Sequence, residues 1–195
     1  MNRAGLLLSI AEAGYNVGFG AKKNFATYDI VQKAPGRIGF VSLAVGIVAL
    51  IYEPLNSKWI AATLAVLGVA SLYVTQYDHN KKEYGDEGER LTALFGRLRN
   101  LYRDVHALSD PDDLTPFRTR LDAAQAEASS KHLSKQILFA DWYAHYKFFW
   151  QHQIEWIDEQ KHFQFWRDKV PLSLTLTLGA AIVLTIVIVA AHLLA

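Results

Sequence analysis

The sequence contains no cysteine, which excludes disulfide bonds, cysteine-ligated zinc and thiol catalysis. Only 5 prolines and 12 glycines occur among its 195 residues, and 12% of the residues are aromatic, so the chain is neither collagen-like nor disordered. The chain also has almost no net charge, because its 20 Lys and Arg are nearly balanced by 19 Asp and Glu. Since nucleic-acid binders carry a basic field, we do not expect a nucleic acid polymer as a partner.

The known motifs of catalysis and cofactor binding are absent as well. The sequence has no P-loop, dinucleotide fingerprint, nucleophile elbow or kinase signature. Glu159 and His162 have the Glu-x-x-His spacing of a di-iron ligand pair, but a di-iron bundle needs a second such pair, and none is present. We therefore expect no enzyme activity, no cofactor and no metal site.

Charge is missing from three stretches of the chain, at residues 38–52, 59–77 and 170–195. The last is long enough for a helix to cross a hydrocarbon core of about 30 Å. The first two are separated by a short segment that contains the turn formers Pro54 and Asn56. The pattern predicts a transmembrane helical hairpin over residues 38–77 and a C-terminal transmembrane helix over 170–195, the alternative to the hairpin being a buried soluble helix pair.

Basic residues indicate the orientation of these spans. Five Lys and Arg precede the first stretch, fourteen lie between residues 78 and 169, and only Lys58 lies in the hairpin loop. By the positive-inside rule, the N-terminal segment 1–37 and the block 78–169 face the cytoplasm, while the hairpin loop and the C-terminus face outside.

Helical periodicity describes much of the two cytoplasmic parts. Residues 2–15 are expected to form a short amphipathic helix, either on the membrane or against the cytoplasmic block. Residues 81–89 are interpreted as a solvated connector or a ligand loop. An apolar stripe predicts a helix over 89–108, and Thr115 with Pro116 predicts the start of another helix, which ends near Ser129.

Residues 131–169 are predicted to form one long helix that continues into the third span, because large rings recur at intervals of seven. The width of its apolar surface predicts either the core of a bundle or an interface between subunits. The residues proposed for this core or seam are Leu138, Trp142, His145, Phe149, His152, Trp156 and Phe163. Where the helix meets the membrane, the expected interfacial anchors are Phe165, Trp166, Arg167 and Lys169.

Small residues recur within the hairpin, in part at the spacing that lets membrane helices approach closely. The residues expected to serve such close packing are Gly39, Ser42, Gly46, Ala61, Ala65 and Gly68. The predicted fold is thus an all-α membrane protein with a transmembrane hairpin, a cytoplasmic helical bundle and a third transmembrane helix.

This arrangement resembles a known family. An N-terminal helix carrying residues 21–25 (Ala-Lys-Lys-Asn-Phe), a tight two-span hairpin and a cytoplasmic helical segment with residues 140–143 (Ala-Asp-Trp-Tyr) are similar to the SLATT domain, a two-transmembrane effector of bacterial nucleotide-signalling systems. The resemblance implies a multi-pass protein of the bacterial inner membrane. It also implies an effector that damages the membrane after infection, when a nucleotide second messenger or a sensor protein signals.

Two functions fit these observations. In the first, the chain is a homo-oligomeric, pore-forming or membrane-disrupting effector of an antiphage system, with the lipid bilayer as its target. In the second, it is a constitutive membrane scaffold that docks a cytoplasmic partner on its helical block. The third span at residues 170–195 departs from the two-span pattern of the family.

Overall fold

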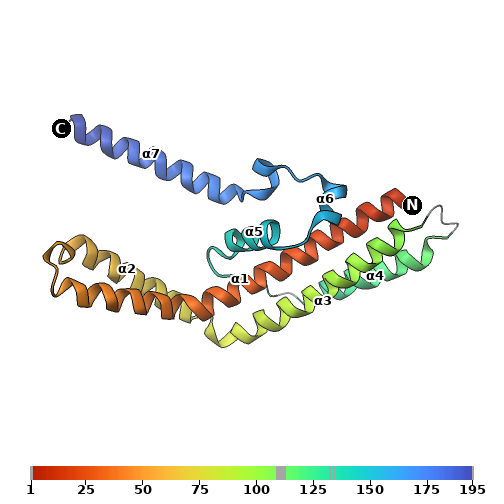
Figure 1. The fold of residues 1–195 in the computed structure, drawn as a ribbon, viewed down its shortest axis with the longest axis horizontal. Helices are drawn as coiled ribbons and strands as arrows, with labels where there is room; N and C mark the ends of the chain where they lie inside the picture. The colour runs from red at the N-terminus through yellow and green to blue at the C-terminus, as the bar shows by residue number, and fades with distance from the viewer. Residues whose placement is uncertain (1, 109–112, 132, 134, 195) are drawn as a thin grey trace.

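The computed structural model describes residues 2–108, 113–131, 133 and 135–194, and every regular element in them is helical. This confirms the predicted all-α class for the described residues. In chain order (Figure 1) the elements are α1 (Arg3–Ala49), the 3₁₀ turn η1 (Glu53–Leu55), α2 (Lys58–Thr75), the 3₁₀ turn η2 (Asp78–Asn80), α3 (Lys81–His106), α4 (Thr115–Ser129), α5 (Ala140–Gln151), α6 (Glu155–Lys161), the π-helical turn η3 (Phe165–Lys169) and α7 (Leu172–Leu194).

Helix α1 is a single helix of 47 residues that joins two segments predicted to be separate. The Asn2 side chain caps it by accepting a hydrogen bond from the Gly5 amide at 2.9 Å. The prediction of a separate short helix over residues 2–15 is therefore wrong, because α1 continues past Tyr15 without interruption. Leu6 and Ile10 are fully buried, so this part packs on the helical block and not on a membrane.

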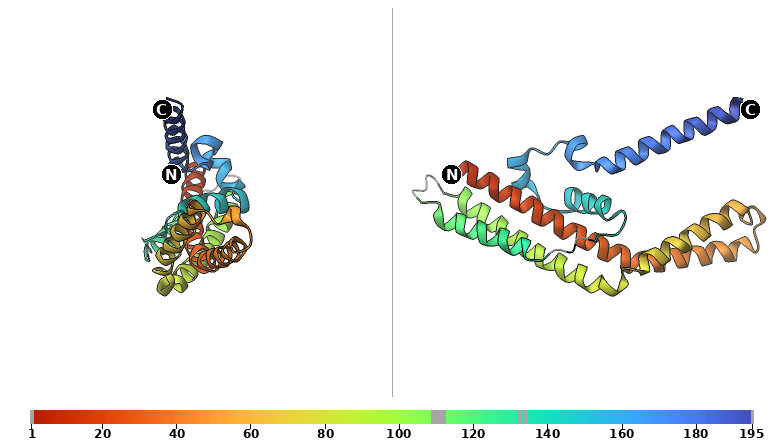
Figure 2. Two further views of the ribbon diagram at one scale, coloured as in Figure 1. Left: turned by 90° about the vertical axis from the view of Figure 1, so that its left-hand side faces the viewer. Right: turned by 180° about the vertical axis from the view of Figure 1, so that it is seen from behind.

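Two helices of the described residues are long and apolar enough to cross a membrane, namely Lys58–Thr75 and Leu172–Ala191. Residues 38–52 do not form a helix of their own, since most of them are the end of α1. The end of α1, α2 and α7 all extend to the same side of the molecule, opposite the N-terminus (Figures 1 and 2). The apolar segments are thus gathered at one end and the charged helices at the other.

The helical block consists of α3, α4, α5 and α6 around the N-terminal part of α1. Helix α3 confirms the predicted helix over 89–108, although it begins at Lys81, so residues 81–89 are helical and not a loop. Helix α4 confirms the predicted start at Thr115, whose amide donates to the Asp113 carboxylate at 2.8 Å. It also ends where expected, at Ser129.

The prediction of one continuous helix over residues 131–169 is wrong. The chain is extended at His152, which separates α5 from α6, and left-handed at His162, with φ of 50°, where α6 ends. The reason lies in Phe148 and Ile157, which are both fully buried in one core. Nine residues are two and a half turns of an α-helix, so a straight helix would point these side chains in opposite directions. The break turns both toward α1 and α3.

Close packing in this core depends on two glycines of α1. A Cβ at Gly18 would lie 2.7 Å from the Phe95 ring and 3.0 Å from the Phe148 ring. A Cβ at Gly14 would overlap the Trp156 indole. Because glycine has no side chain, rings from α3, α5 and α6 reach the backbone of α1 directly.

Candidate functional site

The helical block contains a cavity of about 490 Å³ between α1, α3, α4 and the segment that follows α4. We call it the interhelical cavity. Its walls combine apolar and polar side chains from residues far apart in the sequence. The lining residues are Ala13, Asn16, Val17, Gly20, Lys23, Asn24, Glu87, Leu91, Leu98, Ala124, Gln125, Ala128, Ser129, Lys131, Leu133 and Gln136.

Buried polar side chains gather at this cavity. Among the described residues, the polar or charged residues that are buried are Asn24 (6% exposed), Thr27 (0%) and Glu87 (2%). Asn24 and Glu87 line the cavity, and Thr27 donates a hydrogen bond to the lining residue Gln136. Since burying a polar group costs free energy unless it finds a partner, this clustering marks the cavity as more than a packing defect.

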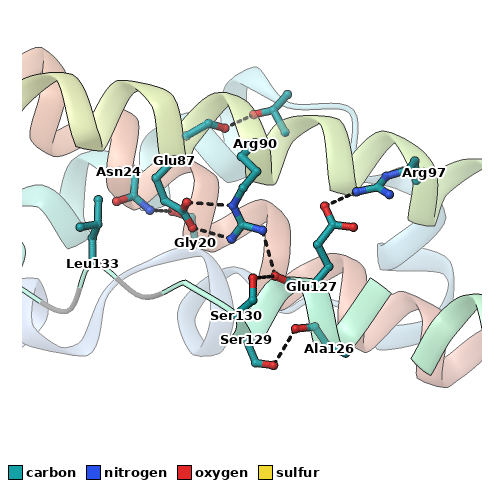
Figure 3. Close-up of polar contacts among 12 residues, drawn as sticks. Gly20, Asn24, Glu87, Arg90, Arg97, Ala126, Glu127, Ser129, Ser130 and Leu133 are labelled. Carbon is teal, nitrogen blue, oxygen red and sulfur yellow. Dashed lines mark hydrogen bonds and ion pairs between the residues drawn. The ribbon is translucent and has the colours of Figure 1, made fainter. Parts of the chain in front are cut away.

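Glu87 is held by a bidentate ion pair. The Arg90 guanidinium donates to its two carboxylate oxygens at 2.7 and 2.9 Å, and this contact raises the pKa of Arg90. A further Arg90 nitrogen donates to the Glu127 carbonyl at 2.9 Å, while Arg97 forms an ion pair with the Glu127 carboxylate (Figure 3). These contacts fix α3 against the end of α4 and hold the Glu87 carboxylate at the cavity wall.

Asn24 faces this carboxylate from α1 (Figure 3). Its amide nitrogen donates to the Gly20 carbonyl at 3.0 Å, and its oxygen accepts a hydrogen bond from Gln136 at 3.4 Å. Within the described ranges, one amide hydrogen of Asn24 and further lone pairs of Glu87 have no partner and are left for a ligand. Lys23, which pairs with Asp141 at 2.8 Å, adds an ammonium group. The arrangement suits binding of a polar small molecule.

The sequence pattern missed this cavity. Asn24 and Thr27 lie on the face of α1 that carries the buried Val17 and Ala21. Two polar residues that continue an apolar helical stripe indicate buried polar groups, and this pattern could have revealed the cavity. Glu87 lies in the segment interpreted as a solvated connector or a ligand loop, and neither interpretation gives its carboxylate a partner in α1. Only the packing of α3 on α1 brings it beside Asn24.

Most residues predicted for a helical seam pack within the chain. His145 lies 4.8 Å from the Phe19 ring, and Phe149 and Phe163 pack at 5.2 Å. Trp156 packs on Phe95 and Tyr102. Leu138 is 61% exposed, and Trp142 donates to the Ser173 hydroxyl at 2.8 Å. These contacts favour the bundle-core alternative, while a role of the set in oligomerisation stays a prediction.

His152 lies at the joint between α5 and α6, with its ring 4.6 Å from that of Phe95. Burial lowers its pKa to about 4, and the positive charges of Lys22 and Arg99 act in the same direction, against Glu155. The imidazole is therefore neutral at physiological pH. The sequence pattern grouped His152 with the seam but gave no reason for its charge state.

The small residues of the hairpin have open space around their glycines in a single chain. Gly39, Ala61, Ala65 and Gly68 are exposed, whereas Ser42 and Gly46 are half-buried. A Cβ added at any of the three glycines would meet no atom within 4 Å. Close packing through these positions therefore stays a prediction for contacts between copies.

The predicted interfacial anchors lie in η3, directly before α7. Phe165 and Trp166 are 46% and 77% exposed, as rings at a membrane surface would be. Arg167 pairs with Asp168 at 3.0 Å, and Lys169 is half-buried. Their contact with lipid stays a prediction.

Comparison with known families gives a match over residues 1–178, to the SMODS and SLOG-associating 2TM effector domain 6. The match includes the whole helical block and the hairpin and ends within α7. No significant match was found among curated proteins or among solved structures. SLATT domains are two-transmembrane effectors associated with nucleotide-signalling defence systems. Because the match covers most of its length, the chain belongs to this SLATT family.

Proposed function

We propose that this chain is a signal-controlled membrane effector, in which the helical block receives a signal and the apolar helices act on the bilayer. The observation that carries the proposal is α1, one helix that lines the interhelical cavity and continues into the hairpin. At about 1.5 Å per residue it is about 70 Å long. A ligand or sensor protein that moves the N-terminal part of α1 therefore moves the hairpin as well.

A bend in α1 supports this mechanism. Pro35 lies inside the helix and is followed by Gly36, at the point where the helix leaves the block. A proline removes one helical hydrogen bond and crowds the preceding turn, so helices bend there. Figure 1 shows the change in direction of α1. The bend separates a cytoplasmic arm from a membrane arm that can change their relative angle.

The membrane arm fits association between copies. Its apolar side chains are exposed in a single chain, and the space around Gly39, Gly46 and Gly68 is open. Small residues on membrane helices allow the close approach of a second helix. We infer that several copies assemble through the hairpin into a pore or a membrane lesion in the bacterial inner membrane, with the helical block on the cytoplasmic side.

We infer the nature of the signal from the lining of the interhelical cavity. The buried Glu87 carboxylate, an amide hydrogen of Asn24 and the lining lysines Lys23 and Lys131 can hold a nucleotide-like molecule with hydrogen-bond donors and an anionic group. A sensor protein that covers the opening is the alternative trigger.

The first experiment compares the wild type with Gly46→Leu by following membrane potential with a voltage-sensitive dye during induced expression in bacteria. The matched control is Gly96→Leu, because a Cβ at Gly96 also meets no atom within 4 Å but the residue lies in α3 of the block. We expect depolarisation by the wild type and the control at high expression, where mass action favours assembly without the signal, and none by Gly46→Leu at equal membrane insertion. Depolarisation by all three proteins would contradict the role of the hairpin.

A constitutive scaffold is the second candidate, and the exposed Trp150 favours it. This side chain is 62% exposed on the block, where a partner could cover it. In that case, the membrane potential stays unchanged at every expression level and Trp150→Ala abolishes capture of a cytoplasmic partner. Depolarisation by the wild type would argue against the scaffold.

A further inference from the structure

A second pocket lies where α1 passes from the block to the hairpin. Its volume is about 290 Å³, and it lies between α1 and α5, lined by Asp29, Ile30, Lys33, Ala34, Arg37, Ile38 and Tyr143. We call it the boundary pocket. Ile38 is the first residue of the charge-free stretch at 38–52, so one side of the pocket faces the segment predicted to enter the membrane.

The charge of the boundary pocket is positive. Asp29 is its single carboxylate, and this carboxylate is already shared by Lys33 at 2.6 Å and by Lys147 from α5. Burial opposes ionisation of Asp29, but the hydrogen bonds from the two lysines outweigh it and lower its pKa. With Arg37 added, these side chains carry an excess of positive charge, which a bound anion would neutralise.

Two donors in the pocket have no partner in the part of the chain that the structure describes. Among the described residues, neither the Arg37 guanidinium nor the Tyr143 hydroxyl forms a hydrogen bond or an ion pair. Tyr143 is half-buried, and its ring is fixed by the Lys147 ammonium 4.6 Å from the ring centroid. A guanidinium, an ammonium and a phenolic hydroxyl around one pocket are the donors that hold a phosphate.

On the side of the hairpin, the surface next to the boundary pocket is apolar. Phe40 and Val41, three and four residues after Arg37, are 73% and 49% exposed. Residues at this spacing lie on one face of a helix, so an apolar track leads from Arg37 along α1 into the hairpin. A free phosphate would leave this track unused, whereas an acyl chain would cover it.

We propose that the boundary pocket binds the phosphate of an anionic phospholipid, with Arg37, Lys33 and Tyr143 on the headgroup and an acyl chain along Phe40 and Val41. The pocket lies directly beside the Pro35–Gly36 bend, so a bound lipid holds the two arms of α1 at a fixed angle. Basic pockets at the cytoplasmic ends of membrane helices are common sites for such headgroups.

The test uses the purified full chain in detergent and measures phospholipid binding by native mass spectrometry. The probes are a phosphatidylglycerol and a phosphatidylcholine of the same acyl chains, each titrated, and inorganic phosphate as a competitor. The variants are Arg37→Gln and Tyr143→Phe. The matched control is Arg118→Gln, which removes the same charge from an exposed position on α4. Circular dichroism verifies the helix content of each variant.

We expect the wild type to prefer phosphatidylglycerol over phosphatidylcholine. Arg37→Gln should lower the affinity for phosphatidylglycerol about fivefold, the equivalent of about 1 kcal/mol for one basic contact at a lipid surface. Tyr143→Phe should lower it less, and Arg118→Gln should leave it unchanged. The proposal is overturned if the wild type shows no preference, if Arg37→Gln and Arg118→Gln behave alike, or if millimolar phosphate displaces the lipid completely, since the last result indicates a free-phosphate site.

Discussion

Replacing Gly18 with alanine tests how closely the core rings approach α1. The added Cβ would lie 2.7 and 2.8 Å from two atoms of the Phe95 ring and 3.0 Å from the Phe148 ring. Both rings are buried, at 3% and 0% exposure, so neither can swing into solvent. The Phe148 ring also meets Tyr15 edge-on at 5.5 Å, which blocks its retreat on that side. Overpacking of this kind costs about 2 kcal/mol.

The same substitution also has a stabilising component, because alanine is a better helix former than glycine by about 1 kcal/mol. The net expectation for Gly18→Ala is a loss of about 1 kcal/mol, which lowers the melting temperature by about 2–4 °C in a chain of this size. Gly96→Ala isolates the helix-propensity component, since its Cβ meets no atom within 4 Å. That control should be as stable as the wild type or up to about 1 kcal/mol more stable.

The assay is thermal unfolding of both variants and the wild type in the same detergent, followed by circular dichroism and by tryptophan fluorescence. Trp156 is a suitable probe because it packs on Phe95 at 5.5 Å. Opposite shifts for the two variants are expected. A Gly18→Ala protein that melts at or above the temperature of Gly96→Ala would refute the reasoning, because it would show that the rings have room for a methyl group.

Three further perturbations follow from single contacts. Glu87→Gln should lower the free energy of unfolding by about 1–3 kcal/mol in a denaturant titration, because the charged Arg90 loses its carboxylate; an unchanged midpoint would mean that the pair is not formed. The pKa of His152 is about 4 in the folded chain, against 6.5 for a free histidine, so the unfolded chain takes up a proton first and stability falls between pH 6.5 and 4, by at most about 3 kcal/mol. His152→Gln should flatten this part of the pH profile of the melting temperature, and an identical profile would contradict the burial of the ring. Trp142→Phe removes the donor to Ser173 and should speed proteolytic cleavage ahead of α7; equal cleavage rates would show that this bond does not anchor α7.

The elements predicted correctly are those set by local pattern. Apolar periodicity located α3, a proline in the first turn located α4, and long charge-free runs located α2 and α7. Each of these signals lies within a few turns of one helix. The family resemblance rested on the same order of elements and is confirmed over residues 1–178.

The break between α5 and α6 could not be predicted from the heptad pattern. Rings at intervals of seven, such as Phe149 and Trp156, fit a continuous helix as well as two shorter ones. What excludes the continuous helix is the core, which must receive both Phe148 and Ile157. This requirement depends on where α1 and α3 lie, and no local pattern contains it.

The sequence by itself determined the helical class, the segregation of charge from apolar runs and the positions of most helices, because hydropathy and helix capping act between neighbouring residues. Only the tertiary structure decided which buried polar groups meet. Asn24, Glu87 and Gln136 come from separate segments and share one cavity because α1, α3 and the segment after α4 pack together. The boundary pocket has the same origin, since Arg37 and Tyr143 become neighbours only where α5 folds back on α1.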